Sequence, residues 1–454
     1  MITQIIQKHG ITQEELAHIL NVSYTSVNAW ATEKRKPQER MQKVLSELLA
    51  ADKLSDYIKS ISPVNIGIRR TDAGFVSTII DYGNLRDPYP YTHGFGRWYG
   101  SLPSFLVRDL LSFLSTDLNN SGDAIVNFCG SGTVALELSI SGRKCTAVDS
   151  NPVAVLLSKV KTTPLTPLLI EDLMREAHRI VYEEQELSGF EGLSEDNLLI
   201  SGAKWIPSDV CRFVLGCLSS IKSINSNEIK NILTITLACI LPDYCCIDKR
   251  CTNHYVYKDA VTFSKEKFAE SYLREIEMFI QKNKELSSIS NYKIPNVQLG
   301  NACALPAEDE SVSLVFSHPP YGTTINYFAI SRIALSVIEA ADIFNNKSNI
   351  FDDCRNNDIS SGTLARFSSF TQNWVSEAYR VLKPGGVLAV VIGDSRNGGT
   401  LSHPFTDVIL AGEQIGFVTK EIFIWVTNHK AGMHVRRKGN HIDHNYILIL
   451  EKKK

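Results

Sequence analysis

Residues 124–152 follow the order strand, glycine-rich loop, helix and second strand, and this order constrains the fold more than any other part of the sequence. The stretch reads AIVNFCGSGTVALELSISGRKCTAVDSNP. Gly130 and Gly132 lie in the loop, where the lack of a side chain lets the backbone approach a bound ligand closely. Asp149 ends the second strand, 17 residues beyond Gly132, where a carboxylate can accept from two ribose hydroxyls. The sequence therefore predicts an α/β fold with a nucleoside-binding crevice.

The α/β pattern returns in the last third of the chain. It comprises an apolar strand at 312–317, a helix near 366–382, a turn and strand at 382–392, and a closing strand pair at 416–426 and 446–453. Neither a GxGxxG sequence nor a Walker lysine motif occurs in the chain. A dinucleotide or a nucleoside triphosphate therefore fits the glycine loop poorly.

Residues 316–322, FSHPPYG, end an apolar strand with two prolines and a tyrosine. Proline donates no N–H, so Pro319 and Pro320 leave neighbouring carbonyls free to act as acceptors in a pocket. Tyr321 offers a flat face on which a planar base can stack. In an open α/β sheet this loop lies at the carboxyl end of its strand, where ligands bind. We therefore expect the loop to bind the exocyclic amino group of a base.

Both stretches resemble the class I S-adenosylmethionine-dependent methyltransferases. NFCGSGT resembles the cofactor loop of that family, and LKPGGVLAVVI resembles its turn and fifth strand. HPPY resembles the signature of DNA amino-methyltransferases that make N4-methylcytosine or N6-methyladenine, in which Asp, Asn or Ser precedes Pro-Pro-Tyr. The longer stretch SHPPYGTTINYFAISRIAL resembles a group of N4-cytosine DNA methyltransferases, and HGFGRWYGSLPSFLVRDLL resembles their motif over the methionine end of the cofactor. The resemblance covers about residues 91–160 and 295–454. It implies a Rossmann-like core and S-adenosyl-L-methionine as the cofactor.

The resemblance also implies which residues form the site. The catalytic residues would be Ser317, His318, Pro319, Pro320 and Tyr321. The cofactor-binding residues would be Phe128, Gly130, Gly132, Thr133, Asp149 and Asn301, of which Asn301 equally suits an ordinary turn. His318 stands where the family has Ser, Asp or Asn. A neutral imidazole can accept from an amino group as those residues do, or it can orient the loop.

The activity implied by this resemblance is methylation of the exocyclic N4 of cytosine in double-stranded DNA, after the base is flipped out of the duplex. A restriction-modification or defence system, with a cognate restriction endonuclease as a further partner, would be its setting. N6 of adenine is the first alternative. An RNA or protein amino-methyltransferase and a cofactor-sensing transcriptional regulator are the others. No Pro-Cys dipeptide occurs, which disfavours cytosine-C5 chemistry.

Residues 11–37 show two short helical patterns divided by a turn, which resembles the helix-turn-helix of phage repressors. Leu16, Ile19 and Leu20 would face inward on the first helix, and Val27 and Trp30 would anchor the second. The DNA-facing residues would then be Tyr24, Thr25, Ser26, Asn28, Lys34 and Arg35. A helical packing or dimerisation module is the alternative interpretation.

The rest of the chain gives weaker indications of organisation. We expect a helix-turn-helix domain at 1–50, a linker at 51–90, and a methyltransferase domain at 91–454 with a mostly helical insertion at about 165–290. Basic residues in two further segments would contact DNA: Lys249, Arg250, Arg436, Arg437 and Lys438. The cluster Cys245, Cys246, Cys251 and His254 lacks the paired spacing of a zinc site, so we expect no metal.

Composition limits the classes of protein to consider. The chain has 454 residues and a formal net charge of -2, so any nucleic-acid surface must be a local patch. The 10 cysteines show no regular spacing, which indicates reduced thiols in a cytoplasmic protein. The N-terminus lacks signal-peptide character, and no apolar run is long enough for a membrane span.

Overall fold

The computed structural model describes most of the chain. The described residues are 1–9, 13, 16, 24–34, 36–37, 42, 45–46, 49–50, 65–70, 76–82, 89–117, 122–183, 190–191, 193–201, 205–247, 262–322, 325–344, 350–359, 364–397, 400–427 and 444–453.

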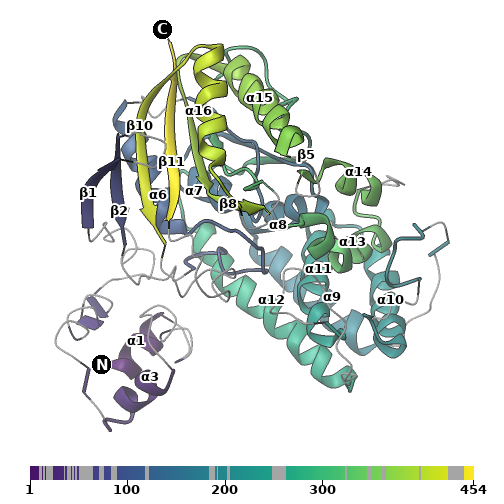
Figure 1. The fold of residues 1–454 in the computed structure, drawn as a ribbon. Coiled ribbons are helices and arrows are strands. Elements are labelled where there is room, and N and C mark those ends of the chain that lie inside the picture. The colour runs from purple at the N-terminus through teal and green to yellow at the C-terminus, as the bar shows by residue number, and fades with distance from the viewer. Residues whose placement is uncertain are drawn as a thin grey trace.

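A twisted, mostly parallel sheet forms the centre of the molecule (Figure 1). In spatial order, its strands within the described residues are β1 (Asn65–Arg70), β2 (Val76–Asp81), β10 (Phe417–Val426), β11 (His444–Lys452), β7 (Leu382–Gly393), β6 (Val312–Ser317), β3 (Ala124–Val126), β4 (Cys145–Asp149) and β5 (Asn296–Leu299). β3 pairs in parallel with both β4 and β6, and β11 is antiparallel to β7 and β10. A small hairpin, β8 (Ser395–Asn397) and β9 (Thr400–Ser402), follows β7. This arrangement confirms the expected Rossmann-like α/β core.

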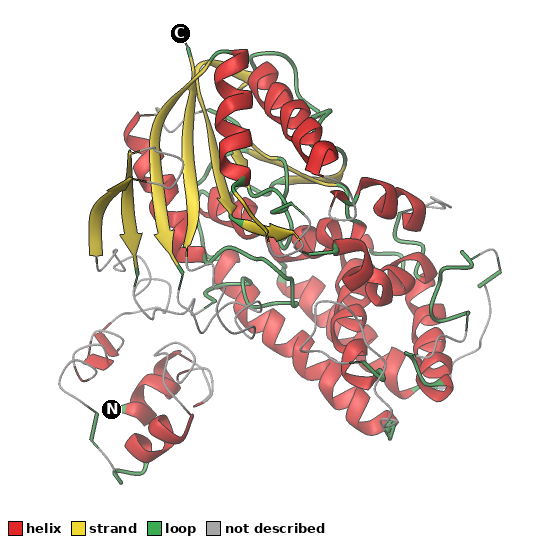
Figure 2. Ribbon diagram, in the orientation of Figure 1, coloured by secondary structure: helices red, strands yellow, loops and turns green. Residues whose placement is uncertain are grey.

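Helices cover both faces of the sheet (Figure 2). They are α6 (Ser104–Asp117), α7 (Thr133–Ile140), α8 (Pro152–Thr162), α15 (Leu364–Val381) and α16 (Pro404–Ile415). Two further helices, α13 (Tyr327–Ala340) and α14 (Ile350–Asn357), pack in the apolar core of the helical subdomain described next. Alternate side chains of a strand point to opposite faces, and β7 shows how this builds two cores. Val387 and Val391 pack in one apolar core with α6 and α7. Leu388 and Val390 pack in the other with α15 and α16.

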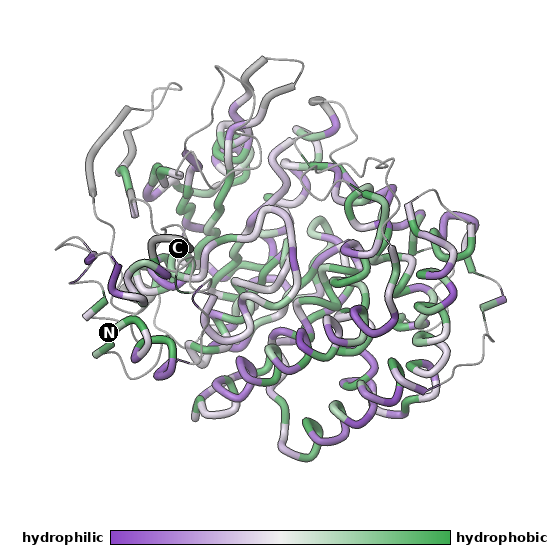
Figure 3. Tube along the Cα trace, turned by 90° about the horizontal axis from the view of Figure 1, so that it is seen from below, coloured by the Kyte–Doolittle hydropathy of each residue, from purple (hydrophilic) through white to green (hydrophobic). Residues whose placement is uncertain are grey.

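In the sequence, a helical subdomain lies between the strands β4 and β5 of the α/β core. It contains α9 (Pro167–Tyr182), α10 (Ser208–Lys222), α11 (Asn227–Ile240), the short 3-10 helix η1 (Leu241–Tyr244) and α12 (Lys265–Ser287). Hydrophilic and hydrophobic residues alternate along several helices of the molecule (Figure 3). α9 buries one face, as expected for a surface helix, whereas α11 is buried over most of its length. The buried Asn197 attaches this region to α13, because its Nδ2 donates to Ser336 O (3.1 Å) and Glu339 Oε2 (2.7 Å). The subdomain is therefore packed against the core.

The segment expected to be a linker differs from that expectation. Within 51–90, strands β1 and β2 form an antiparallel pair, and β2 adds in parallel to β10. The turn formers of DYGNLRDPYPYTHG, residues 81–94, favour a linker, whereas VSTIID at 76–81 carries β-branched residues that suit a strand. A pairing with β10, more than 300 residues later, is not visible in local sequence.

The N-terminal region is helical where it is described. This region contains α1 (Ile2–His9) and α3 (Tyr24–Ala31). Leu16 and Val27 are buried, as the sequence predicted. Trp30 is partly buried against the same apolar cluster. Ile19 and Leu20, expected on the inward face of the first helix, lie outside the described residues.

Candidate active site

A cavity of about 380 Å³ opens at the carboxyl ends of the central strands. β3, β4 and β6 are adjacent and parallel, so the residues that follow them meet at one edge of the sheet. The chain runs outward from β3 to β4 and β5 on one side, and to β6 and β7 on the other. A sheet that reverses its strand order in this way forms a ligand crevice at the reversal. The predicted cofactor loop and the predicted catalytic loop both reach this crevice.

The glycine loop after β3 has the backbone conformation that its sequence predicted. Gly130 has φ +48° and Gly132 has φ +85°, both in the left-handed region that favours glycine. A Cβ on Gly132 would lie 2.6 Å from Ser158 Oγ. Gly132 also precedes α7, which begins at Thr133. Phe128, Gly130 and Thr133, the first residue of α7, all line the cavity.

Asp149 ends β4 and faces the glycine loop. Its Oδ2 accepts from Gly130 N and its Oδ1 accepts from Asn151 N, both at 2.9 Å. Each carboxylate oxygen still has a lone pair for a hydroxyl of a ligand in the cavity. Burial raises the pKa of Asp149 to about 6, although backbone N–H groups of Asn151, Gly130 and Ser150 act in the opposite direction.

This raised pKa predicts a pH dependence for nucleoside binding. A protonated carboxyl accepts more weakly from ribose hydroxyls, so the Kd of S-adenosylhomocysteine should rise as the pH falls through about 6 and stay level above about 7. Calorimetric titrations between pH 5 and pH 8 would measure this change. Because the folded-state pKa lies above the usual value, Asp149 itself stabilises the fold as the pH falls, so its titration would not unfold the protein. An unchanged pH profile in Asp149→Asn would contradict this assignment.

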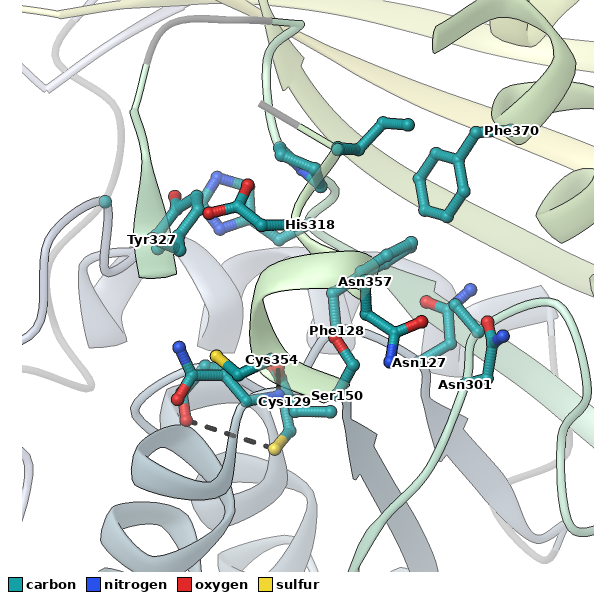
Figure 4. Close-up of a pocket in the computed structure, with 18 of the residues that line it drawn as sticks. Asn127, Phe128, Cys129, Ser150, Asn301, His318, Tyr327, Cys354, Asn357 and Phe370 are labelled. Carbon is teal, nitrogen blue, oxygen red and sulfur yellow. Dashed lines mark hydrogen bonds between the residues drawn. The ribbon is translucent and has the colours of Figure 1, made fainter. Parts of the chain in front are cut away.

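Aromatic and amide side chains form one side of the cavity. Asn301 follows β5 and lines the cavity, with its Oδ1 accepting from Cys303 N at 2.9 Å. Phe128 makes edge-to-face contacts with Phe370 of α15 and with Trp374. Figure 4 shows Asn127, Asn301 and Phe370 on one side of the view, and His318 and Tyr327 on the other. The two sides suit a long ligand with different chemistry at its ends.

The proline loop after β6 contributes only part of its side chains to the cavity. Of its described residues, His318 and Pro320 line the cavity. Ser317 is fully buried, and its Oγ donates to Asn127 Oδ1 at 2.6 Å. Pro319 is also buried. Ser317 therefore connects the ends of β6 and β3.

His318 and Tyr321 form a hydrogen-bonded pair. The Nε2 atom of His318 lies 2.8 Å from Oη of Tyr321, and the two rings meet edge to face. Burial lowers the pKa of His318 to about 4, so the imidazole is neutral at physiological pH. Burial raises the pKa of the Tyr321 phenol above its usual value. If Nε2 donates to Tyr321, then Nδ1 is an acceptor.

Gly393 at the end of β7 provides the space for the Tyr321 ring. A Cβ at this position would lie 2.5 Å from Tyr321 Cε2 and would also clash with Oδ1 of Asn445. We expect Gly393→Ala to displace the Tyr321 ring, to lower the free energy of unfolding by about 1–3 kcal/mol, and to reduce the methyl transfer that the resemblance implies. Urea unfolding and methylation rates would measure both effects. Gly94→Ala is a milder control, since its Cβ would lie 3.1 Å from Tyr89 Cβ. Full activity in Gly393→Ala would show that the ring position is unimportant.

The structure adds residues that were not predicted individually. Trp98 and Tyr327 both line the cavity, and their rings stack at 5.9 Å with an interplanar angle of 18°. Each lies in a stretch that resembled the methyltransferase family, so the motif rather than the single residue was the signal. Asn127 and Asp358 also line the cavity. Asn127 is the first residue of the stretch NFCGSGT that resembled the cofactor loop, whereas Asp358 stands in no pattern that the sequence analysis selected.

The predicted DNA-binding residues are only partly described. Asn28 on α3 and Lys34 just beyond it are exposed. Tyr24, Thr25 and Ser26 lie on α3, but their side chains are outside the described set. Arg35, Lys249, Arg250, Arg436, Arg437 and Lys438 lie outside the described residues. The DNA-facing role of all of these residues stays a prediction.

The predicted cysteine cluster is also incomplete, because Cys251 and His254 lie outside the described residues. Across the described part of the chain, no group of three or more His, Cys, Asp or Glu side chains is arranged to hold a metal ion. None of the helices described combines the length and apolar character that crossing a bilayer requires.

Comparison with protein families assigns two parts of the chain. Residues 312–454, which begin with β6 and the proline loop, match the family described as DNA methylase. Residues 2–50 match the helix-turn-helix family, which confirms the predicted class of the N-terminal region. The residues matched to the DNA methylase family include His318 and Pro320, which line the cavity. No curated protein sequence gives a significant match.

Solved structures overlap with the chain at low similarity. An S-adenosylmethionine-dependent methyltransferase from Methanosarcina mazei is 11% identical, with 75% of this chain and 97% of that chain covered and a TM-score of 0.30. An rRNA methyltransferase from Streptomyces viridochromogenes is 10% identical, covering 78% and 86%, with a TM-score of 0.32. A protein from Thermus thermophilus, described as a putative DNA modification methylase in complex with S-adenosyl-L-methionine, is 20% identical, covering 33% and 49%, with a TM-score of 0.21. At these values the overlaps do not bear on the activity of this chain.

Proposed function

We propose that this protein transfers a methyl group from S-adenosyl-L-methionine to the exocyclic N4 of cytosine in double-stranded DNA. Its setting is a restriction-modification or related defence system, with a cognate restriction endonuclease as a further partner. The observation that carries the proposal is that one cavity is lined by both functional loops. Gly130 and Asp149 line it from the cofactor side, and His318 and Pro320 line it from the proline loop.

The cofactor side fits an adenosine ligand. Asp149 offers acceptors for ribose hydroxyls, the glycines allow close backbone approach, and Phe128 and Asn301 provide an apolar face and an amide beside them. S-adenosyl-L-methionine, when bound, supplies an electrophilic methyl group on a sulfonium sulfur. The residues of the chain then have to bind and orient the cofactor and the target base, and to exclude water from the reacting nitrogen.

The proline loop fits the target amino group. Pro319 and Pro320 donate no N–H, so their part of the backbone presents acceptors. His318 is neutral and can accept an amino hydrogen through Nδ1 while Nε2 donates to Tyr321. Acceptors around both amino hydrogens favour a pyramidal nitrogen with its lone pair directed at the methyl group. Through its bond to Asn127, Ser317 positions this loop from inside the wall of the cavity.

Cytosine is favoured over adenine by the resemblance of residues 317–335 to N4-cytosine enzymes, in which a serine usually precedes Pro-Pro-Tyr. Here His318 takes that position and Ser317 stands one residue earlier, inside the wall of the cavity. Double-stranded DNA is favoured by the helix-turn-helix at 2–50. The target base must leave the duplex, because a stacked amino group cannot reach a cavity at the edge of the sheet.

Incubation with labelled S-adenosyl-L-methionine and mixed-sequence duplex DNA, followed by nucleoside mass spectrometry, tests the proposal. Labelled N4-methylcytosine, absent with a Tyr321→Ala variant, is the expected result. Labelled N6-methyladenine would leave the proposed mechanism in place but would show that the target base is adenine. Label in added RNA or protein, with none in DNA, would contradict a DNA substrate.

The helix-turn-helix also supports a second activity, repression of the operon that encodes the protein. Asn28 is exposed on α3, the element that would enter the major groove. A footprint on the protein's own promoter, lost in Asn28→Ala while methylation of other DNA persists, would establish this role. Equal protection of the promoter by the wild-type protein and by Asn28→Ala would show that Asn28 takes no part in this repression.

A further inference from the structure

A second cavity lies near the amino ends of the central strands, whereas the proposed active site lies at their carboxyl ends. Its volume is about 460 Å³, and none of the described residues that line it also lines the first cavity. Arg143 enters it just before β4, Leu111 from α6 and Leu138 from α7. Ile289 and Asn291, between α12 and β5, also line it. α7 therefore runs from the glycine loop of the first cavity to this second cavity.

The carboxylate that lines this second cavity is already paired. Glu137 is buried in α7, where its Oε1 accepts from Arg108 Nη2 at 2.6 Å and its Oε2 accepts from Arg108 Nε at 3.0 Å. Nε2 of the buried His93 also lies 2.8 Å from Oε1. Two parallel bonds between a guanidinium and a carboxylate are the strongest form of such a pair. Arg108 and Glu137 together therefore add no net charge to the cavity.

Arg143 brings a positive charge to the cavity, and its hydrogen bonds go to neutral acceptors. Only 5% of its surface is exposed. Its Nε donates to Gly122 O at 3.0 Å, and its Nη2 donates to Ser313 Oγ at 3.1 Å. Within the described part of the chain, Arg143 forms no ion pair with a carboxylate. A buried charge without a counter-charge is costly, so an anion that reaches Arg143 would bind favourably.

The walls of the second cavity select among anions. Its apolar and aromatic lining residues are Tyr91, Leu111, Leu138, Ile140 and Ile289. An inorganic anion such as phosphate would leave this apolar surface in contact with water. A single uncompensated positive charge also matches a monoanion. An anion with one carboxylate and an apolar body satisfies both conditions.

We propose that the second cavity binds a small monocarboxylate with an apolar body, whose carboxylate accepts hydrogen bonds from the guanidinium of Arg143. A guanidinium carries more N–H donors than the two bonds to Gly122 and Ser313 use, and its planar fork matches a carboxylate. The apolar body would lie against Leu138 and Ile140 of α7. The site is separate from the proposed methyl transfer, because it takes no residue from the first cavity.

A purely structural role is the alternative for Arg143, since its bonds join the chain before β3 to β6 and a cation suits the carboxyl end of α7. Two pairs of variants separate the roles. Arg143→Gln removes the charge from the cavity, and Lys144→Gln is its control, because Lys144 is adjacent and exposed. Ile289→Trp fills the cavity and leaves Arg143 in place. Ile294→Trp is its control, because Ile294 is 63% exposed in the same segment before β5.

Calorimetric titration of the full chain with two probes tests the proposal. 3-Phenylpropionate carries a carboxylate on an apolar body, and 3-phenylpropionamide is a neutral analogue of nearly the same shape. We expect the wild-type protein to bind the acid about tenfold or more tightly than the amide, as hydrogen bonds between charged groups imply. In Arg143→Gln this ratio should fall to about one, whereas Lys144→Gln should keep it. Ile289→Trp should weaken binding of the acid about tenfold or more, and Ile294→Trp should not.

Absence of acid binding by the wild-type protein, or equal affinity for the two probes, would overturn the proposal. An unchanged ratio in Arg143→Gln would overturn it as well, and a lower unfolding temperature of that variant would then indicate the structural role. If Arg143→Gln does not fold, Ile289→Trp decides. Unchanged acid binding in Ile289→Trp would place the acid outside this cavity and so contradict the proposal, whereas a loss that Ile294→Trp does not share would support it.

Discussion

Replacing His318 by alanine is expected to lower the rate constant of methyl transfer about a hundredfold or more, with little change in cofactor affinity. The imidazole lines the cavity from the proline loop and is neutral because burial lowers its pKa to about 4. Alanine removes the acceptor for the target amino group and also the partner of Tyr321 Oη. Single-turnover assays at saturating labelled cofactor and DNA, together with calorimetry for the cofactor Kd, would separate the two quantities.

Two variants control this experiment. His318→Asn keeps a side-chain acceptor of the kind that the family uses at this position, so it should retain much more activity than alanine. His178→Ala changes a histidine of α9, in the helical subdomain, and should behave as wild type. If alanine and asparagine are equally impaired, His318 orients the loop through Tyr321 and does not contact the base. If alanine is fully active, the proline loop does not need this side chain.

Asp149→Ala is expected to weaken cofactor binding about a hundredfold or more, because two hydrogen bonds from hydroxyls to a carboxylate are lost. The variant also removes the acceptors of Gly130 N and Asn151 N, so the cofactor loop loses an attachment to β4. Calorimetric titration with S-adenosylhomocysteine measures the loss in affinity. Thermal unfolding without ligand measures the effect on stability.

Asp123→Asn is a matched control, because Asp123 is exposed and lies just before β3, at the opposite end of the strand from the cavity. It should bind the cofactor as wild type does. Wild-type affinity in Asp149→Ala would mean that the carboxylate does not hold the ribose. A comparable loss in Asp123→Asn would mean that net charge, not position, controls binding.

Local sequence was sufficient to predict those parts of the site whose conformation depends on residues that are neighbours in the chain. Gly130 and Gly132 adopt positive φ between a strand and a helix, as their spacing predicted. The strand predicted at 312–317 is β6, and the proline loop follows it. These features are readable because strand, turn and helix preferences act over a few residues, and because parallel strands bring their carboxyl ends to one edge.

The tertiary structure decided which side chains reach the cavity. Ser317 and His318 are adjacent in sequence, yet Ser317 bonds to Asn127 inside the wall while His318 lines the cavity. Tyr321 packs over Gly393, and Asp358 enters the site through α14. β2 joins β10 although the local pattern suggested a linker. The sequence by itself determined the fold class, the two loops and their chemistry. The contacts between distant segments determined the orientation of their side chains, because packing across the sheet selects one arrangement among several that local preferences allow.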